Sequence, residues 1–203
     1  MLRLMVQGGR DATGIEDTVR ELGTLCKERG IGLNVGEAGE IFRLLAGTGT
    51  FGTHVRVYMA KDKHSNAPEG FSGELIECNV MGRDVQDRIK NDYYFPDDPP
   101  GSDRLAWAIR LACFAASNGF IFFPGREGTL AHLVPIMAFI AKGERDKGAS
   151  RPRRVALVDW PNAKKDAILE LFNIGDDDEW IGSFTINEMP KVITWLVDGL
   201  PAK

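Results

Sequence analysis

Residues 119–130 read Gly-Phe-Ile-Phe-Phe-Pro-Gly-Arg-Glu-Gly-Thr-Leu, and this stretch decides the expected fold. Its first five residues are apolar, as expected for a strand in the centre of a parallel sheet. A proline ends the strand, two glycines bracket a tight turn, and Thr129 opens a helix. Such a turn presents bare backbone N–H groups and the positive end of a helix dipole to an anion. We therefore expect a phosphate to approach the backbone at Gly125 and Gly128, with Thr129 adding a hydroxyl donor.

Outward from this stretch, short apolar segments alternate with segments of helical periodicity. Strands are expected over 2–7, 31–35, 54–59, 74–81, 119–123 and 154–159, and helices over 14–29, 38–46, 103–117, 129–142, 161–172 and 187–198. The alternation predicts an α/β fold, a single Rossmann-like, doubly wound domain over 1–203 with a mainly parallel sheet of about six or seven strands. Residues 143–152 are expected to form a basic loop. Ligands of such folds lie beyond the carboxyl ends of the strands, here at the loops 7–14, 36–40 and 124–129.

The composition excludes several classes of protein. Hydrophobic residues make up 43% and charged residues 27%, which excludes a disordered chain. The net charge of −4 disfavours a non-specific nucleic-acid binder, so no nucleic-acid partner is expected. The three cysteines, Cys26, Cys78 and Cys113, stand far apart, which indicates a reducing context and thiols in the core. The longest apolar run, 133–141, is shorter than the roughly 20 residues of a membrane span. We expect a soluble cytoplasmic protein without membrane contact.

Two glycine motifs are set aside. Residues 47–52 match GxGxxG but follow a helix and precede a strand, the reverse of the dinucleotide-binding context, so a dehydrogenase is disfavoured. Residues 9–14 have Walker spacing but lack the lysine and the Ser/Thr of that motif. The histidines show no metal-ligand spacing. We predict no metal site and no required cofactor.

The candidate binding residues lie at the three loops beyond the strands. The predicted phosphate- and nucleotide-binding residues are Gly8, Gly9, Arg10, Gly36, Gly39, Gly125, Arg126, Gly128 and Thr129. Arg126 either contacts the phosphate bidentately or points into solvent, and the loop after the first strand is either part of the site or a plain turn. The aromatic run 93–95 either stacks on a base or anchors the Pro-rich loop that follows it.

The segment 122–130, FFPGREGTL, resembles the PGGxGTxxE motif of the LOG (LONELY GUY) family, whose members long carried the name lysine decarboxylase by mistake. Residues 6–14 and 30–39 resemble the family's first glycine loop and its GIxLVYGGG segment, and 153–172 with 179–184 resemble its closing elements. The resemblance implies a Rossmann-like, nucleotide-binding homodimer. Active members cleave the N-glycosidic bond of nucleoside 5′-monophosphates with an arginine and the glutamate of the motif. Related members bind nucleotides or molybdenum cofactor without known hydrolysis.

The chain departs from the family pattern at both catalytic positions. Arg126 replaces the second glycine, and His132 stands where the family has its glutamate. The family's Arg-Lys pair falls on 109–110, so Arg110 is one candidate for the guanidinium, and Arg104 or Arg88 are the alternatives.

These departures bear on catalysis. The reaction passes through an oxocarbenium-like transition state. A carboxylate either stabilises the positive charge of this state or activates the attacking water. His132 could act as a base but cannot present a fixed negative charge. Glu127, inside the loop, could substitute for the missing acid, or it could simply complement the helix dipole.

We therefore expect a protein that binds a phosphorylated nucleotide or nucleotide-like cofactor without the family's hydrolysis. Two alternatives stay open: a phosphoribohydrolase that uses Glu127 or another carboxylate, and an oligomeric interaction module with a vestigial pocket. If His132 faces the ligand, affinity should rise as the pH falls through about 6.5. The apolar helix after the motif predicts a homodimer that buries Met137 together with Phe139 or Ile140, and Pro135 should kink this helix or mark an irregular first turn.

Overall fold

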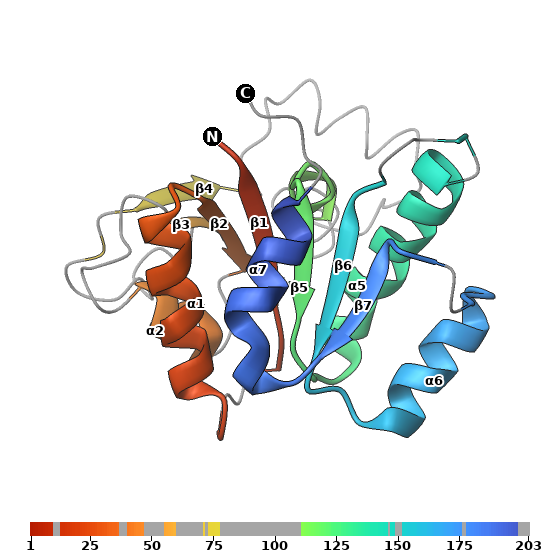
Figure 1. Ribbon diagram of the computed structural model, residues 1–203. Coiled ribbons are helices and arrows are strands. Elements are labelled where there is room, and N and C mark those ends of the chain that lie inside the picture. The colour runs from red at the N-terminus through yellow and green to blue at the C-terminus, as the bar shows by residue number, and fades with distance from the viewer. Residues whose placement is uncertain are drawn as a thin grey trace, which may run out of the picture.

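Seven strands form one sheet in the order β4-β3-β2-β1-β5-β6-β7 in the computed structural model of the chain (Figure 1). The structure describes residues 1–9, 13–36, 40–46, 55–59, 71, 73–77, 111–145, 147–148, 152–175 and 178–198. The strands are β1 (Arg3–Gln7), β2 (Gly32–Gly36), β3 (Val55–Met59), β4 (Glu74–Glu77), β5 (Gly119–Phe122), β6 (Arg154–Val158) and β7 (Ile181–Phe184). Every neighbouring pair is parallel. The predicted α/β class and strand number are confirmed.

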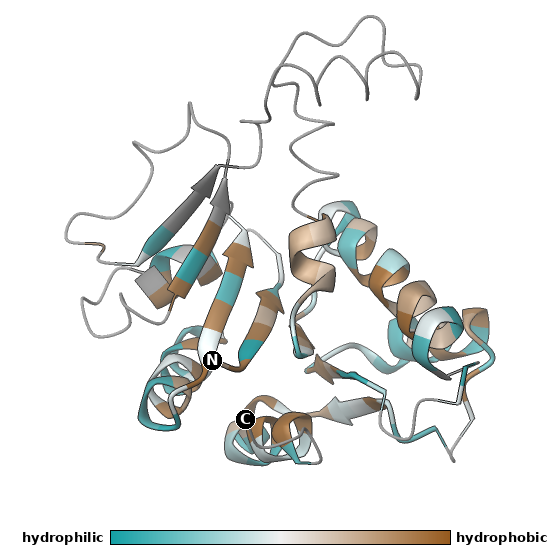
Figure 2. Cartoon of the chain, turned by 90° about the horizontal axis from the view of Figure 1, so that it is seen from above, coloured by the Kyte–Doolittle hydropathy of each residue, from teal (hydrophilic) through white to brown (hydrophobic). Residues whose placement is uncertain are grey.

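Helices cover both faces of the sheet. They are α1 (Glu16–Glu28), α2 (Glu40–Ala46), α5 (Glu127–Ile140), α6 (Asn162–Leu171) and α7 (Met189–Val197). Side chains of α1, α2 and α7 pack with one set of strand residues, and those of α5 and α6 pack with the other set. Figure 2 shows the apolar strands lying between these two layers. This arrangement is the doubly wound architecture that the alternation predicts.

The strand order places the switch point of the sheet between β1 and β5. From β1 the chain proceeds outward through β2, β3 and β4, then returns to pair β5 with β1 and proceeds the other way to β6 and β7. The pairing sets Val6 beside Ile121 and Gln7 beside Phe122. Ligands of open α/β sheets bind at the carboxyl ends of the strands where the order reverses. The fold therefore predicts a ligand-binding site at the residues that follow Gln7 and Phe122.

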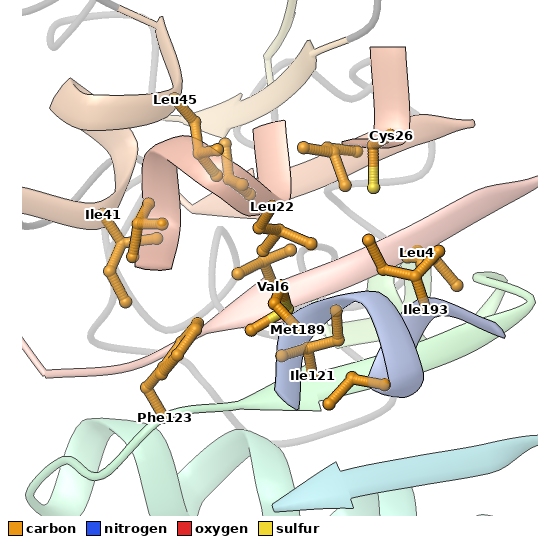
Figure 3. Packing of buried hydrophobic residues seen from close by; sticks show 14 of the residues in the cluster. Leu4, Val6, Leu22, Cys26, Ile41, Leu45, Ile121, Phe123, Met189 and Ile193 are labelled. Carbon is orange, nitrogen blue, oxygen red and sulfur yellow. The ribbon is translucent and has the colours of Figure 1, made fainter. Parts of the chain in front are cut away.

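The core beneath this switch point is dense. Val6, Ile121 and Phe123 lie against Leu22 of α1 and Met189 of α7 (Figure 3), and each of these side chains is almost fully buried. Burying a side chain of this size stabilises the fold by about 1.5–3 kcal/mol. The loops at the carboxyl ends of β1 and β5 therefore begin at strand ends whose side chains are held in the packed core.

The cysteines that the structure describes fit the expectation of core thiols. Cys26 is fully buried on α1, and burial raises the pKa of its thiol to about 12. Cys113 is partly buried, and desolvation raises its pKa as well. Cys78 lies outside the described residues. Among the residues described, no helix has the length and apolar character needed to cross a membrane.

Two segments differ from the sequence-based expectation. Residues 181–184 form the edge strand β7, and the sequence analysis predicts no strand there; the segment is short and half-exposed, and its Gly-Ser centre hides the apolar alternation. Residues 141–145 continue α5 as a π-helix, so residues 143–145 are helical where the sequence predicts the start of a loop. Glu144 of this π-helix accepts hydrogen bonds from the backbone N–H and from Nε of Arg153, at 2.6 and 2.5 Å. This contact with the segment before β6 holds the extra helical turn in place.

Other boundaries agree to within a few residues. The helix expected over 187–198 begins as a 3-10 turn, Ile186–Glu188, and continues as α7. The N–H and hydroxyl of Thr185 and the Lys191 ammonium donate hydrogen bonds to Glu188, which lowers the pKa of this carboxyl to about 2. Helix α5 runs through Pro135 without ending. Of the helix expected over 103–117, residues 111–115 are helical, and the part before 111 lies outside the description.

Candidate functional site

The loops that follow β1 and β5 are hydrogen-bonded to each other at the switch point. The N–H of Phe123 donates to the carbonyl of Gln7 at 2.8 Å, and the N–H of Gly9 donates to the carbonyl of Pro124 at 3.0 Å. These bonds extend the pairing of the two strands beyond their ends. The expected first loop and the expected phosphate turn are thus parts of one structure.

Gly125 is required by close packing within this structure. A Cβ on Gly125 would overlap the Thr129 hydroxyl, and it would lie 2.6 Å from the Thr129 Cβ and 3.0 Å from the Gly9 nitrogen. Gly8 is similarly confined, since a Cβ there would meet the end of the Ile41 side chain and lie 3.0 Å from the Phe123 Cβ. Only glycine lets the three segments approach so closely.

The N-cap residue of α5 makes no side-chain capping bond. Arg126 is this N-cap residue, and its backbone angles are extended. The N–H groups of Thr129 and Leu130 both donate to the Arg126 carbonyl, at 3.0 and 3.2 Å. The N–H groups of Glu127 and Gly128 have no acceptor within the described part of the chain. Since Glu127 and Gly128 are exposed, these two donors and the helix dipole are available to an anion.

Thr129 and His132 are both buried, at 3% and 5% exposure. The Thr129 side chain packs against Gly125, and this contact stabilises the turn. The Nδ1 of His132 lies 3.0 Å from the carbonyl of Gly128, and because a carbonyl only accepts, Nδ1 is the donor. The imidazole meets the Phe114 ring edge-on, with 5.4 Å between centroids. His132 therefore lies on the face of α5 that packs against residues 111–115.

Arg126 and Glu127 are both exposed at the start of α5. Glu127 occupies the first turn, where a carboxylate complements the helix dipole. Gly36 ends β2, two strands from β5, and is half-buried. Several candidates from the sequence lie outside the described residues: Arg10, Gly39, Arg88, Arg104, Arg110 and the aromatic run 93–95. Within the described residues no group of three or more His, Cys, Asp or Glu side chains is placed to hold a metal ion.

Trp160 is a supporting residue that the sequence motifs do not single out. It follows β6, is 6% exposed, and donates from its indole Nε1 to the carbonyl of Phe122 at 2.8 Å. This bond fixes the last residue of β5, directly before the turn into α5. A tryptophan just after a central strand, at the edge where ligands bind, is the signal that could have identified it.

Together these features define a class: a parallel, doubly wound α/β fold with a glycine-bracketed, uncapped helix N-terminus at its switch point. Solved structures of the same fold support this description. No protein-family model matches the chain, and no curated protein matches it in sequence.

Among solved structures, the chain is similar to the molybdenum cofactor carrier protein of Chlamydomonas reinhardtii, with a TM-score of 0.57, 13% identity and coverage of 97% of this chain and 98% of that one. A molybdenum cofactor binding protein of Rippkaea orientalis gives a TM-score of 0.53 with 14% identity, over 97% and 96% of the two chains. DNA processing protein A of Helicobacter pylori, described for its single-stranded DNA binding mode, gives a TM-score of 0.56 with 11% identity, over 98% of this chain and 82% of that one. At these identities the likeness concerns the fold.

Proposed function

We propose that the protein binds a phosphorylated nucleotide or a nucleotide-like cofactor at the turn between β5 and α5, without hydrolysing it. The observation that carries the proposal is the uncapped N-terminus of α5, with the N–H groups of Glu127 and Gly128 open to an anion at the switch point. The solved structures of molybdenum cofactor proteins with this fold support a ligand of this kind.

The state of His132 supports binding over hydrolysis. The LOG resemblance implies a glutamate at this position that meets the ribose. Here the position holds an imidazole that packs on Phe114 and bonds within its own helix. A buried imidazole supplies no fixed negative charge for an oxocarbenium ion. Glu127 is the carboxylate of this turn that is open to solvent, so it is the residue on which any hydrolysis would depend.

The experiment is a titration of the protein with AMP, GMP, CMP, UMP and inorganic phosphate by calorimetry, with chromatography of the same samples for free base. We expect saturable binding of at least one nucleotide and no release of base above the protein-free control. Glu127→Gln is the matched variant, which keeps the shape of the side chain. Base release by the wild type that is lost in Glu127→Gln would replace this proposal with a phosphoribohydrolase.

A single-stranded oligonucleotide, oligo(dT), belongs in the same panel because one solved structure of this fold is a DNA-binding protein. The net charge of −4 is the opposite of the basic balance that is typical of proteins binding a phosphate backbone. We expect no saturable binding of oligo(dT) at moderate salt. Binding of oligo(dT) in preference to nucleotides would make nucleic acid the partner.

We also propose that two chains associate through the exposed side of α5. Met137 and Ile140, named from the sequence as dimer residues, are instead fully buried in the chain's own core, because they face the sheet. Leu130 and Phe139 are 38% and 52% exposed on the same helix, about half a turn apart around its axis. The Arg153 guanidinium lies 5.2 Å from the centre of the Phe139 ring, so the exposed surface near Phe139 combines apolar atoms with one cation. No charged residue lies between Glu127 and Lys142, so this helix offers an apolar surface.

We expect light scattering at micromolar concentration to give twice the mass of one chain, and Phe139→Glu to give the mass of a single chain. Placing a charge in an apolar interface opposes its burial, which is the physical reason for dissociation. Leu171→Glu, an exposed leucine of α6, is the control and should leave the dimer intact. A single-chain mass for the wild type would overturn the proposed dimer. It would also exclude the alternative function of an oligomeric interaction module.

A further inference from the structure

Asp159, directly after β6, has a left-handed backbone conformation. Among the described residues other than glycine, Asp159 and Asn173 have positive φ angles, of 56° and 49°. Asn173 follows the last turn of α6 and donates its N–H to the Glu170 carbonyl, which is where left-handed residues commonly end helices. Asp159 ends no helix, because it directly follows β6. A left-handed conformation costs free energy and concentrates at ligand-binding positions.

The residues around Asp159 hold this conformation in place. Its N–H donates to the Phe184 carbonyl of β7 at 2.8 Å. The next residue, Trp160, is fixed by its bond to the Phe122 carbonyl of β5. Asp159 itself is exposed. No side-chain hydrogen bond or ion pair of its carboxylate occurs within the part of the chain that is described. The structure therefore fixes the backbone of Asp159 on both sides and leaves its carboxylate to the solvent.

Asp159 lies beside the phosphate turn. Phe122 pairs in register with Leu157, so the residues after Phe122 run alongside Val158 and Asp159. Neighbouring strands lie about 4.8 Å apart. A carboxylate this close to a bound phosphate repels it. A ligand that carries hydrogen-bond donors next to its phosphate would offset this repulsion by donating to the carboxylate.

We infer that Asp159 is a specificity-determining residue, whose carboxylate accepts hydrogen bonds from the vicinal hydroxyls of a sugar while the attached phosphate binds at the N-terminus of α5. The inference rests on the proposed function. The sugar of a nucleotide adjoins its 5′-phosphate, so a phosphate at the turn brings the sugar within reach of the neighbouring strand end, where Asp159 lies. The two oxygens of a carboxylate can accept one hydrogen bond from each hydroxyl of a diol. The ligand class is therefore a phosphorylated sugar or nucleotide with a free diol.

The test is a binding cycle with AMP, 2′,3′-dideoxy-AMP, which lacks the diol, and inorganic phosphate. Asp159→Asn keeps the shape and tolerates positive φ, and we expect it to bind AMP about tenfold or more weakly, the usual cost of losing hydrogen bonds to a charged acceptor. Dideoxy-AMP should bind the variant at least as tightly as the wild type, because it lacks the diol and its phosphate no longer meets the Asp159 charge. Inorganic phosphate should bind the variant no more weakly than the wild type.

Two further variants separate backbone effects from ligand contacts. Asp159→Gly and Asn173→Gly both accept positive φ, so neither should lower Tm. We expect Asp159→Gly to weaken AMP binding as Asp159→Asn does, and Asn173→Gly to leave it unchanged. Equal affinity of wild type and Asp159→Asn for AMP, or an equal loss for AMP and dideoxy-AMP, would overturn the role of Asp159 and leave the phosphate site standing. Failure of all three probes to bind the wild type would overturn the proposed function itself.

Discussion

Gly128→Asp is expected to lower the affinity for AMP by about tenfold or more without unfolding the protein. The space around a Cβ at Gly128 is open, with no atom within 4 Å apart from its chain neighbours and the backbone of its own helix. An aspartate in the first turn of α5 also complements the helix dipole, so the helix itself should not be weakened. The new carboxylate would occupy the region where we place the phosphate. Two unit charges about 4 Å apart near a protein surface repel by as much as about 4 kcal/mol.

Gly128→Asn is the matched control for this prediction. It has the same shape as aspartate and carries no charge, so it should keep most of the affinity for AMP. Calorimetry on both variants and thermal unfolding of each give the comparison. Equal affinities for the aspartate and asparagine variants would contradict a phosphate at this turn, because charge is the difference between them.

Gly125→Ala is expected to lower the free energy of unfolding by about 1–3 kcal/mol and to abolish AMP binding. The added methyl group would overlap the Thr129 hydroxyl and press on the Gly9 nitrogen, both of which belong to the packed turn. Relief requires the loop after β1 and the start of α5 to move apart. That movement would break the bond from the Gly9 N–H to the Pro124 carbonyl and displace the donors of α5.

Gly128→Ala serves as the control, three residues along the same turn. Its methyl group would meet nothing within 4 Å, and alanine favours helix over glycine by up to about 1 kcal/mol. Urea denaturation should therefore show unchanged or greater stability for Gly128→Ala and a clear loss for Gly125→Ala. Similar stabilities of the two variants would mean that the turn is not packed as described.

Hydrophobic periodicity is sufficient to predict most of the fold. The apolar run at 119–123 predicts β5, and the glycines and proline that follow it predict the turn into α5. The edge strand β7 cannot be predicted in this way, because Gly182 and Ser183 break the apolar alternation of a half-exposed strand. The π-helix after α5 depends on Glu144 meeting Arg153, a contact between segments that local propensity does not contain.

The candidate site is predictable where it is a local pattern. Gly125, Gly128 and Thr129 belong to one continuous turn, so their spacing alone indicates their proximity. Gly9 is predicted as well, because the sequence places it directly after the first strand. The contributions of Trp160 and Asp159 come from another strand end and are not predicted. Their place beside the turn follows from the strand order, which sequence spacing does not specify. The side of α5 on which His132 lies depends likewise on how that helix packs against Phe114.

The central claim is that a phosphate binds at the N-terminus of α5. The most direct test is an NMR titration of the wild-type protein with AMP, in which each backbone amide is followed separately. We predict that the largest saturable shifts fall on the amides of Glu127 and Gly128, with smaller shifts on Gly9 and Gly125. Saturable shifts that leave these four amides unchanged and fall elsewhere would contradict the account.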